Sequence, residues 1–129
     1  MPPSLGRVLI VEDEPDVAAV LEYALLRAGA TEVLVATDGL FAIELAGREL
    51  PDLILCDLML PGLDGLEVAT RLRAPGSNVH APIVFVTAAA HTAFRAKPPS
   101  DYGAIGVLAK PFDVHRLGEQ ILELLARAP

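Results

Sequence analysis

The stretch LILCDLMLPG, residues 53–62, decides the fold. It opens with three aliphatic residues and a cysteine, runs into one acid, Asp57, and then turns at Pro61 and Gly62. An unbroken apolar run of this length is typical of a strand buried on both faces of a parallel sheet. A carboxylate at the end of such a strand is costly to bury unless partners compensate its charge. The stretch therefore predicts a central strand that ends in a functional aspartate.

Similar apolar runs recur along the chain and alternate with amphipathic segments. They predict strands at residues 8–11, 33–36, 53–56, 83–86 and 106–109. Helical periodicity predicts helices over residues 17–28, 40–46, 66–72 and 114–125, the last with Asp113 as its N-cap. Strands that alternate with helices in this way predict a parallel sheet with helices on both faces.

The segment between the last two strands, residues 88–105, fits this pattern least well. Residues 88–97 are compatible with a short helix, which Pro98 and Pro99 must end. The following residues, PSDYGA, predict a loop. We therefore expect a fourth helix that is short, displaced or partly unfolded.

Length and composition favour one domain over residues 1–129, with a core at about 6–127 and no effector domain. Hydrophobic residues make up 53% of the chain, and no apolar run approaches the roughly 18 residues of a membrane span. The net charge of −7 argues against direct binding of nucleic acid. No secretory signal is evident at the start, so we expect a cytoplasmic protein. The single cysteine, Cys56, excludes an internal disulfide and is interpreted as a core residue.

Polar residues follow all five predicted strands. Thr37 and Asp38 follow the second, which is expected to lie at the edge of the sheet, so we give these two little functional weight. Glu12 and Asp13 come after the first, Asp57 ends the third, Thr87 the fourth and Lys110 the fifth. Because the carboxyl ends of parallel strands lie at one edge of the sheet, these side chains are expected to converge there. Clustered carboxylates attract a divalent cation, and an aspartate can attack phosphorus to form an acyl phosphate. Lysine and threonine then complete a cradle for a phosphoryl group.

Taken singly, each of these residues has an ordinary structural interpretation. The acids 12–14 can cap a helix and favour its first turn, and we keep that interpretation for Glu14. Thr87 can be a simple strand end, and Lys110 a solvated one. His91 is interpreted as a solvated or capping residue. The functional interpretation rests on all the polar residues falling at the same end of their strands.

Four segments together resemble the receiver domain of response regulators in two-component signalling. They are VLIVEDEP, DLILCDLMLPGLDGLE, PIVFVTA and GAIGVLAKPF, and they span essentially the whole chain in order. The resemblance implies a flavodoxin-like (βα)5 fold, doubly wound, with a five-stranded parallel sheet of order 2-1-3-4-5. It also implies a signalling domain rather than an enzyme, active only in its own phosphorylation and dephosphorylation.

The resemblance assigns roles to the acids. Asp57 is the phosphoacceptor and takes its phosphoryl group from a histidine kinase or a histidine phosphotransfer protein. Mg²⁺, or Mn²⁺, is held by Asp57, Glu12, Asp13 and the backbone carbonyl of Met59. The phosphorylated domain then changes its surface toward a downstream protein target.

The resemblance also assigns roles to residues on the last two strands. Lys110, before a Pro111 whose peptide bond is usually cis, and Thr87 contact the phosphoryl group. The position of the usual switch aromatic is occupied by Val107, which cannot swing as an aromatic ring does. The switch at Thr87 and Val107 is therefore atypical.

Apolar residues flank the predicted site at Met59 and Ala89, where more polar residues often stand. They offer no group to orient an attacking water, so we expect slow self-dephosphorylation. An aspartyl phosphatase usually has a second Asp at the position of Met59 and needs a substrate-binding cap. This chain has Met59 at that position and no residues to spare for a cap, and both facts argue against a phosphatase.

A degenerate receiver that binds proteins without phosphorylation remains the alternative function. We expect a monomer that can form a phosphorylation-dependent homodimer, without membrane association. The kinase, the target, and the choice between a stand-alone protein and part of a larger regulator or hybrid kinase stay open.

Overall fold

Strands and helices alternate along the part of the chain that the computed structural model describes, residues 5–90 and 92–128. The strands are β1 (Gly6–Val11), β2 (Ala30–Ala36), β3 (Leu53–Asp57), β4 (Ile83–Thr87) and β5 (Ala104–Ala109). The α-helices are α1 (Pro15–Arg27), α2 (Gly39–Glu49), α3 (Gly65–Leu72) and α4 (Val114–Arg127). Each predicted strand lies within one of these strands, which confirms all five.

The five strands form one parallel sheet of order β2-β1-β3-β4-β5, as predicted. The strand order reverses between β1 and β3, where Val11 pairs with Cys56. In open parallel sheets a crevice forms at such a reversal, outside the carboxyl ends of the strands. The fold therefore places that crevice beside Asp57.

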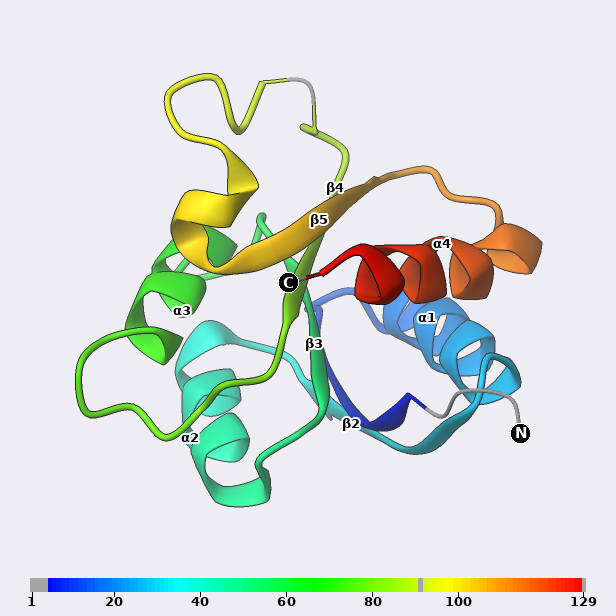
Figure 1. Cartoon of the computed structure of the whole chain (residues 1–129), viewed down its shortest axis with the longest axis horizontal. Helices are drawn as coiled ribbons and strands as arrows, with labels where there is room; N and C mark the ends of the chain where they lie inside the picture. Colours follow the sequence, from blue (N-terminus) through cyan, green and yellow to red (C-terminus); the bar gives the residue numbers. More distant parts are fainter. Residues whose placement is uncertain (1–4, 91, 129) are drawn as a thin grey trace.

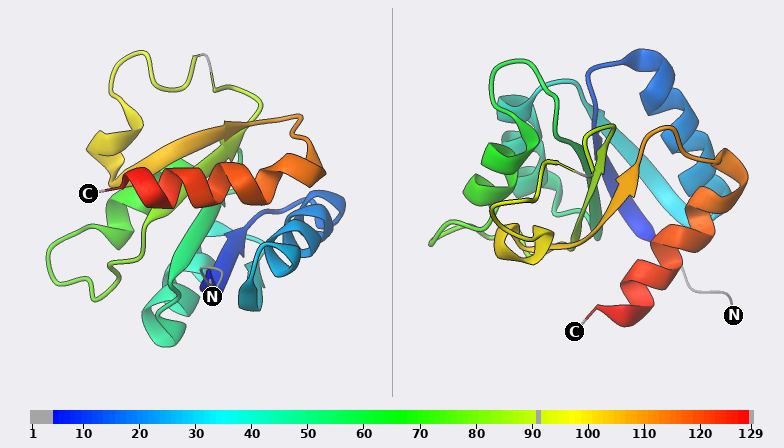
Figure 2. Two further views of the ribbon diagram at one scale, coloured as in Figure 1. Left: turned by 45° about the vertical axis from the view of Figure 1, so that its right-hand side comes forward. Right: turned by 90° about the horizontal axis from the view of Figure 1, so that it is seen from above.

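Helices α1 and α4 cover one face of the sheet, and α2 and α3 cover the other (Figures 1 and 2). The side chains of β3 alternate between the two layers: Leu53 and Leu55 pack on the α1/α4 side, and Ile54 and Cys56 on the α2/α3 side. Both faces are thus apolar, which explains the unbroken run at 53–56.

Three of the helices have an aspartate at their N-cap position. The side chain of Asp38 accepts a hydrogen bond from Phe41 N at the start of α2, and Asp64 accepts one from Glu67 N at the start of α3. Asp113 accepts one from His115 N and caps α4, as predicted.

The connection between β4 and β5 forms no α-helix in its described residues. It consists of turns followed by a short 3-10 helix, η1 (Pro99–Tyr102). The expected irregularity is confirmed, but the described residues of 88–97 form turns and bends rather than a short helix. Pro99 opens η1 instead of ending a preceding helix, because proline fits the first turn, where no N–H donor is needed.

Within the described residues, the helices are all too short or too polar to cross a membrane.

Candidate functional site

Three carboxylates meet at the reversal of strand order. Glu12 and Asp13 directly follow β1, and Asp57 is the last residue of the neighbouring β3. One carboxylate oxygen from each of the three lies within 4.8 Å of the others. Glu12 and Asp57 are buried, at 1% and 4% exposure, whereas Asp13 is exposed. The convergence of the acids predicted from the sequence is present in the structure.

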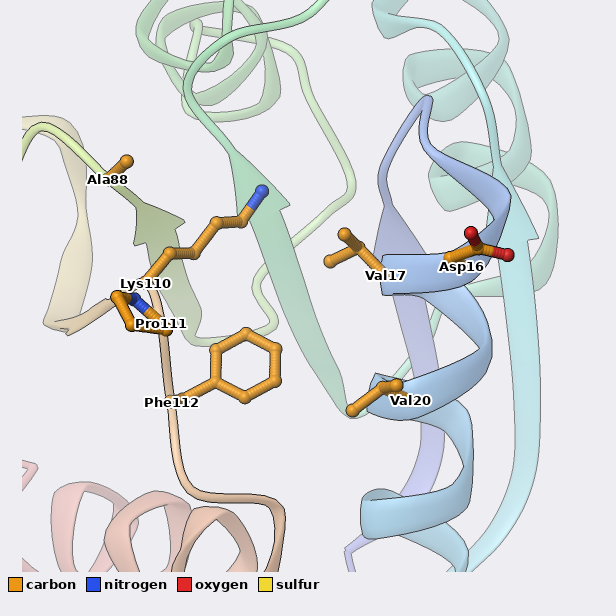
Figure 3. Close-up of a pocket in the computed structure, with 7 residues that line it drawn as sticks. All are labelled: Asp16, Val17, Val20, Ala88, Lys110, Pro111 and Phe112. Carbon is orange, nitrogen blue, oxygen red and sulfur yellow. The ribbon is translucent and has the colours of Figure 1, made fainter.

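Lys110 bridges the two buried acids. Its Nζ lies 2.9 Å from Glu12 Oε1 and 3.1 Å from Asp57 Oδ2. Figure 3 shows the side chain extending from the loop after β5 toward the carboxyl ends of the central strands. The Lys110–Pro111 peptide bond is cis, as the sequence resemblance implied. The ammonium group thus offsets part of the charge that the clustered carboxylates bring.

Burial and charge shift the pKa values of this pair. Burial raises the pKa of Glu12, an effect that its hydrogen bond with Lys110 only partly offsets. Burial acts to lower the pKa of Lys110, but its hydrogen bonds with Glu12 and Asp57 outweigh that effect and raise it. Lys110 is therefore charged at neutral pH and is available to hold an anionic group.

Backbone amides orient the two buried carboxylates. Glu12 Oε2 accepts a hydrogen bond from Glu14 N at 3.1 Å, and Asp57 Oδ1 accepts one from Met59 N at 3.1 Å. Glu14 occupies the N-cap position of α1 but makes no capping bond through its own side chain. Glu12 therefore serves both the helix start and the site, which sequence reasoning had treated as separate roles.

Thr87 lies on the strand next to Asp57. It follows Val86, which pairs with Asp57, and it is fully buried. Its Oγ1 accepts a hydrogen bond from Ala89 N at 3.0 Å. The hydroxyl thus holds the turn that leaves β4.

The remaining predicted residues lie around the site in different ways. Met59 is 72% exposed at its rim. Val107 lies on the edge strand β5, opposite Phe85, and is partly buried against the α2/α3 layer of the core. Cys56 is a core residue, as predicted, and burial raises the pKa of its thiol. His91 lies outside the described residues.

Sequence reasoning missed Gly65, the first residue of α3. A Cβ there would overlap the backbone carbonyl of Asp57, and Gly65 N donates a hydrogen bond to Leu58 O at 3.0 Å. The helix can therefore approach the site closely only because this residue has no side chain. The sequence signal was the Asp64–Gly65 pair at the start of the predicted third helix.

An apolar hollow of about 440 Å³ opens beside Lys110, between α1 and the loop after β5. Val17 and Val20 line it from α1, and Pro111 and Phe112 line it from the opposite side (Figure 3). In this view Asp16 points away from the hollow. The charged site is thus bordered on one side by an apolar surface.

Comparison with known proteins agrees with this geometry. A family model, the response regulator receiver domain, matches residues 8–122. The chain is 37% identical to the response regulator ArlR of Staphylococcus saprophyticus over 97% of its own length and 54% of that protein. It is 35% identical to the alkaline phosphatase synthesis transcriptional regulatory protein PhoP of Bacillus subtilis, over 95% of its length and 49% of that protein. The chain therefore spans about half the length of these curated relatives.

Solved structures share the fold. The receiver domain of the sensor histidine kinase PA1611 of Pseudomonas aeruginosa, crystallised with a magnesium ion in its active site cleft, has a TM-score of 0.79. It is 32% identical and covers 93% of this chain and 97% of its own. The response regulator TrrA of Thermotoga maritima, in complex with Mg²⁺-BeF, has a TM-score of 0.77 at 30% identity, covering 92% and 98% of the two chains. With its sheet order, its acidic cluster and its match to the family model, this chain belongs to the response regulator receiver domains of two-component signalling.

Proposed function

We propose that this receiver accepts a phosphoryl group on Asp57. The observation that carries the proposal is the environment of that carboxylate. It is nearly buried at the end of a central strand, hydrogen-bonded by Lys110 Nζ, and close to the carboxylates of Glu12 and Asp13. A receiver that served only as a protein-binding module would have no need for this costly arrangement of buried charge.

The transfer is a displacement at phosphorus. One carboxylate oxygen of Asp57 forms the new P–O bond of an acyl phosphate, and the P–N bond of the donor phosphohistidine breaks. The imidazole nitrogen keeps the electron pair of that bond and leaves as a neutral ring after taking up a proton. The protein contributes position and charge, since the carboxylate is already oriented by Met59 N and Lys110.

The acids fit a divalent cation. Three carboxylates within 4.8 Å repel one another, and a single lysine neutralises only part of their charge. Glu12, Asp13 and Asp57, with the backbone carbonyl of Met59, would hold Mg²⁺, and Mn²⁺ accepts the same oxygen ligands. When bound, the cation supplies charge neutralisation for the phosphoryl oxygens. The magnesium reported in the PA1611 and TrrA structures supports this assignment.

Lys110 and Thr87 are the proposed contacts of the phosphoryl group itself. The Lys110 ammonium donates to Asp57 before transfer and is positioned to donate to a phosphoryl oxygen afterwards. The Thr87 hydroxyl, one residue past the partner of Asp57 on the adjacent strand, is the second donor.

The proposed donor is a histidine kinase or a histidine phosphotransfer protein, since receiver domains take their phosphoryl groups from histidine kinases. The apolar hollow beside Lys110 supports a protein donor, because it offers an apolar contact surface next to the site. The proposed output is a changed surface for a downstream protein. We place this activity in the cytoplasm and expect a monomer that can dimerise when phosphorylated.

The relatives include transcriptional regulators, but they are about twice as long as this chain. The net charge of −7 opposes binding of a phosphate backbone by these residues. We therefore assign no nucleic-acid contact to the receiver itself.

We further propose that the acyl phosphate is long-lived. Met59 and Ala89 flank the site and provide no polar side chain to orient an attacking water. Rapid quenching at increasing times after removal of donor measures the lifetime, and a loss within seconds would contradict the proposal.

The central experiment is phosphorylation by acetyl phosphate in Mg²⁺, followed by intact mass. The wild type and an Asp101→Asn control, changed at an exposed acid of η1, should gain one phosphoryl group, whereas Asp57→Asn should gain none. A labelled Asp57→Asn protein, or a wild type that never takes label, would overturn the proposal.

A further inference from the structure

The usual aromatic of the switch is replaced by Val107, but aromatic side chains gather nearby. Phe85 on β4 contacts Phe94 in the β4–β5 connection, with ring centroids 5.5 Å apart. Tyr102, the last residue of η1, lies 6.3 Å from Phe85 and 6.2 Å from Phe94. These three rings pack against the α2/α3 side of the sheet, the same side as Val107. The aromatic bulk is therefore carried by β4 and the irregular connection rather than by β5.

This aromatic cluster is joined to the site through Thr87. Thr87 and Phe85 are two residues apart on β4 and so share one face of the sheet. The Thr87 hydroxyl accepts a hydrogen bond from Ala89 N at 3.0 Å. Ala89 O in turn accepts bonds from Thr92 N at 3.0 Å and Ala93 N at 2.9 Å, directly before Phe94. The Thr87 hydroxyl thus ties the turn to β4, while bonds within the turn, including one from Thr92 Oγ1 to Ala89 O at 3.3 Å, lead on to Phe94.

The far end of the connection is fixed by Arg73, which follows α3. Its guanidinium donates to the carbonyl of Gly103, just before β5, at 3.2 Å. It also donates to the carbonyls of Val79 and Ala81 in the loop before β4. The connection is therefore held at Thr87 and at Gly103, while its middle is held by the ring contacts.

We propose that the β4–β5 connection, through Phe94 and Tyr102, reads out phosphorylation in place of a β5 aromatic. The proposal rests on the proposed phosphorylation of Asp57. A phosphoryl group there adds acceptor oxygens next to the strand that carries Thr87. When the Thr87 side chain rotates so that its hydroxyl donates to one of them, the oxygen moves away from Ala89 N, the bond that it accepts there is lost, and the turn is released from β4. Phe94 and Tyr102 then repack against Phe85, which changes the surface of the connection.

The unphosphorylated and phosphorylated conformations differ in the hydrogen-bond partner of the Thr87 hydroxyl. Through that difference the phosphoryl group stabilises one conformation over the other. A ligand shifts a conformational equilibrium only through such a differential interaction. Val107 has no part in it, because its short branched side chain stays packed opposite Phe85 in either state.

The chain offers a direct probe of this change. It has no tryptophan and two tyrosines, so in a Tyr23→Phe background Tyr102 is the only tyrosine fluorophore. Acetyl phosphate and Mg²⁺ are added, intact mass gives the phosphorylated fraction, and Tyr102 emission is read on the same sample. We expect the emission to change in proportion to the phosphorylated fraction.

Matched substitutions locate the route. Phe94→Leu should remove the emission change while the protein takes the same label, whereas Phe41→Leu, on the exposed start of α2, should leave it intact. Val107→Ala should also leave it intact. As a measurement free of core substitutions, the amide resonance of Ala89 in the Tyr23→Phe protein should shift on phosphorylation.

The outcomes separate the two proposals. A fully labelled protein whose Tyr102 emission and Ala89 amide are unchanged overturns the readout but leaves phosphorylation standing. Loss of the signal in Val107→Ala but not in Phe94→Leu also overturns it, in favour of β5. A protein that takes no label overturns the proposed function, and the readout with it.

Discussion

The charge balance at the site rests on a single lysine. The chain has two lysines, Lys97 and Lys110, and of these Lys110 contacts the buried acids. Its bonds with Glu12 and Asp57 raise its pKa, although burial acts in the opposite direction. The ammonium therefore remains charged throughout the neutral range and is preorganised for an anionic transition state.

Replacing Lys110 by methionine should slow phosphorylation of Asp57 by acetyl phosphate by about 10²-fold, the usual cost of removing one preorganised donor. Methionine keeps much of the length and removes the charge. Lys97→Met, at an exposed position of the β4–β5 connection, is the matched control and should phosphorylate at the wild-type rate. Equal rates for the two variants would show that Lys110 does not act on the phosphoryl group.

Two helical glycines, one with no room for a side chain and one with ample room, test the close approach of α3 to Asp57. Gly65→Ala would push a methyl group into the backbone of Asp57, so we expect it to lower the free energy of unfolding by about 1–3 kcal/mol and to slow phosphorylation. Gly47→Ala, within α2, meets only Asn78 Oδ1 at 3.7 Å and should stabilise by roughly 0.5–1 kcal/mol. Urea unfolding of both variants provides the measurement. A neutral Gly65→Ala would mean that α3 can move away without cost.

The charged residues of the site were predictable, because each falls immediately after an apolar run of strand length. Glu12, Asp57 and Lys110 converge from strands that are adjacent or nearly so, as the expected strand order required. The contributions of Gly65 and of Ala89 N were not predicted. The Asp64–Gly65 pair marks a helix start, but nothing local in the sequence shows that this helix approaches Asp57 closely, and Ala89 N is a backbone group without a sequence signature.

Among the elements, the β4–β5 connection departs most from a regular strand-helix repeat. The Pro98–Pro99 pair predicted that no regular helix spans this connection, but the sequence did not show which structure forms there instead. The structure shows ring contacts of Phe94 and Tyr102 with Phe85, and a guanidinium that ties the start of β5 to the end of α3. Such contacts join residues far apart in sequence, so no local periodicity reports them.

Arg73 should therefore contribute more to stability than an ordinary helix arginine. Burial lowers its pKa, and it donates to three backbone carbonyls. Arg73→Leu leaves those carbonyls without this donor, so the free energy of unfolding should fall by about 2 kcal/mol.

The matched control is Arg71→Leu on the exposed side of the same region. Arg71 makes one ion pair, with Glu67, at about half exposure, and its loss should change stability by no more than about 0.5 kcal/mol. Chemical denaturation of both variants decides the matter. If Arg73→Leu and Arg71→Leu had the same free energy of unfolding, water would be replacing the Arg73 hydrogen bonds at no cost.

For the molecule as a whole, the parallel sheet brings residues that are distant in sequence together into one site. Charges from three segments, the residues after β1, the end of β3 and the residue after β5, meet because parallel strands bring their carboxyl ends to one edge. Helices bury both faces of the sheet, so the strands cannot spread to relieve the repulsion. The folded state therefore holds close carboxylates that the unfolded chain would keep apart, and a cation that binds them should stabilise folding.

Mg²⁺ should accordingly raise the thermal stability of the protein. A ligand that binds only the folded state adds about 2.7 kcal/mol at one hundred times its Kd, and the midpoint of unfolding should rise with Mg²⁺ concentration. Asp13 is the exposed member of the cluster, so Asp13→Asn should fold without loss of stability in EDTA. That variant should lose most of the Mg²⁺-dependent rise, while Asp101→Asn keeps it. Differential scanning calorimetry at constant ionic strength makes the comparison. An equal rise in wild type and Asp13→Asn would mean that the ion stabilises the chain from some other place, because removing one of three converging carboxylates must weaken a site that they build together.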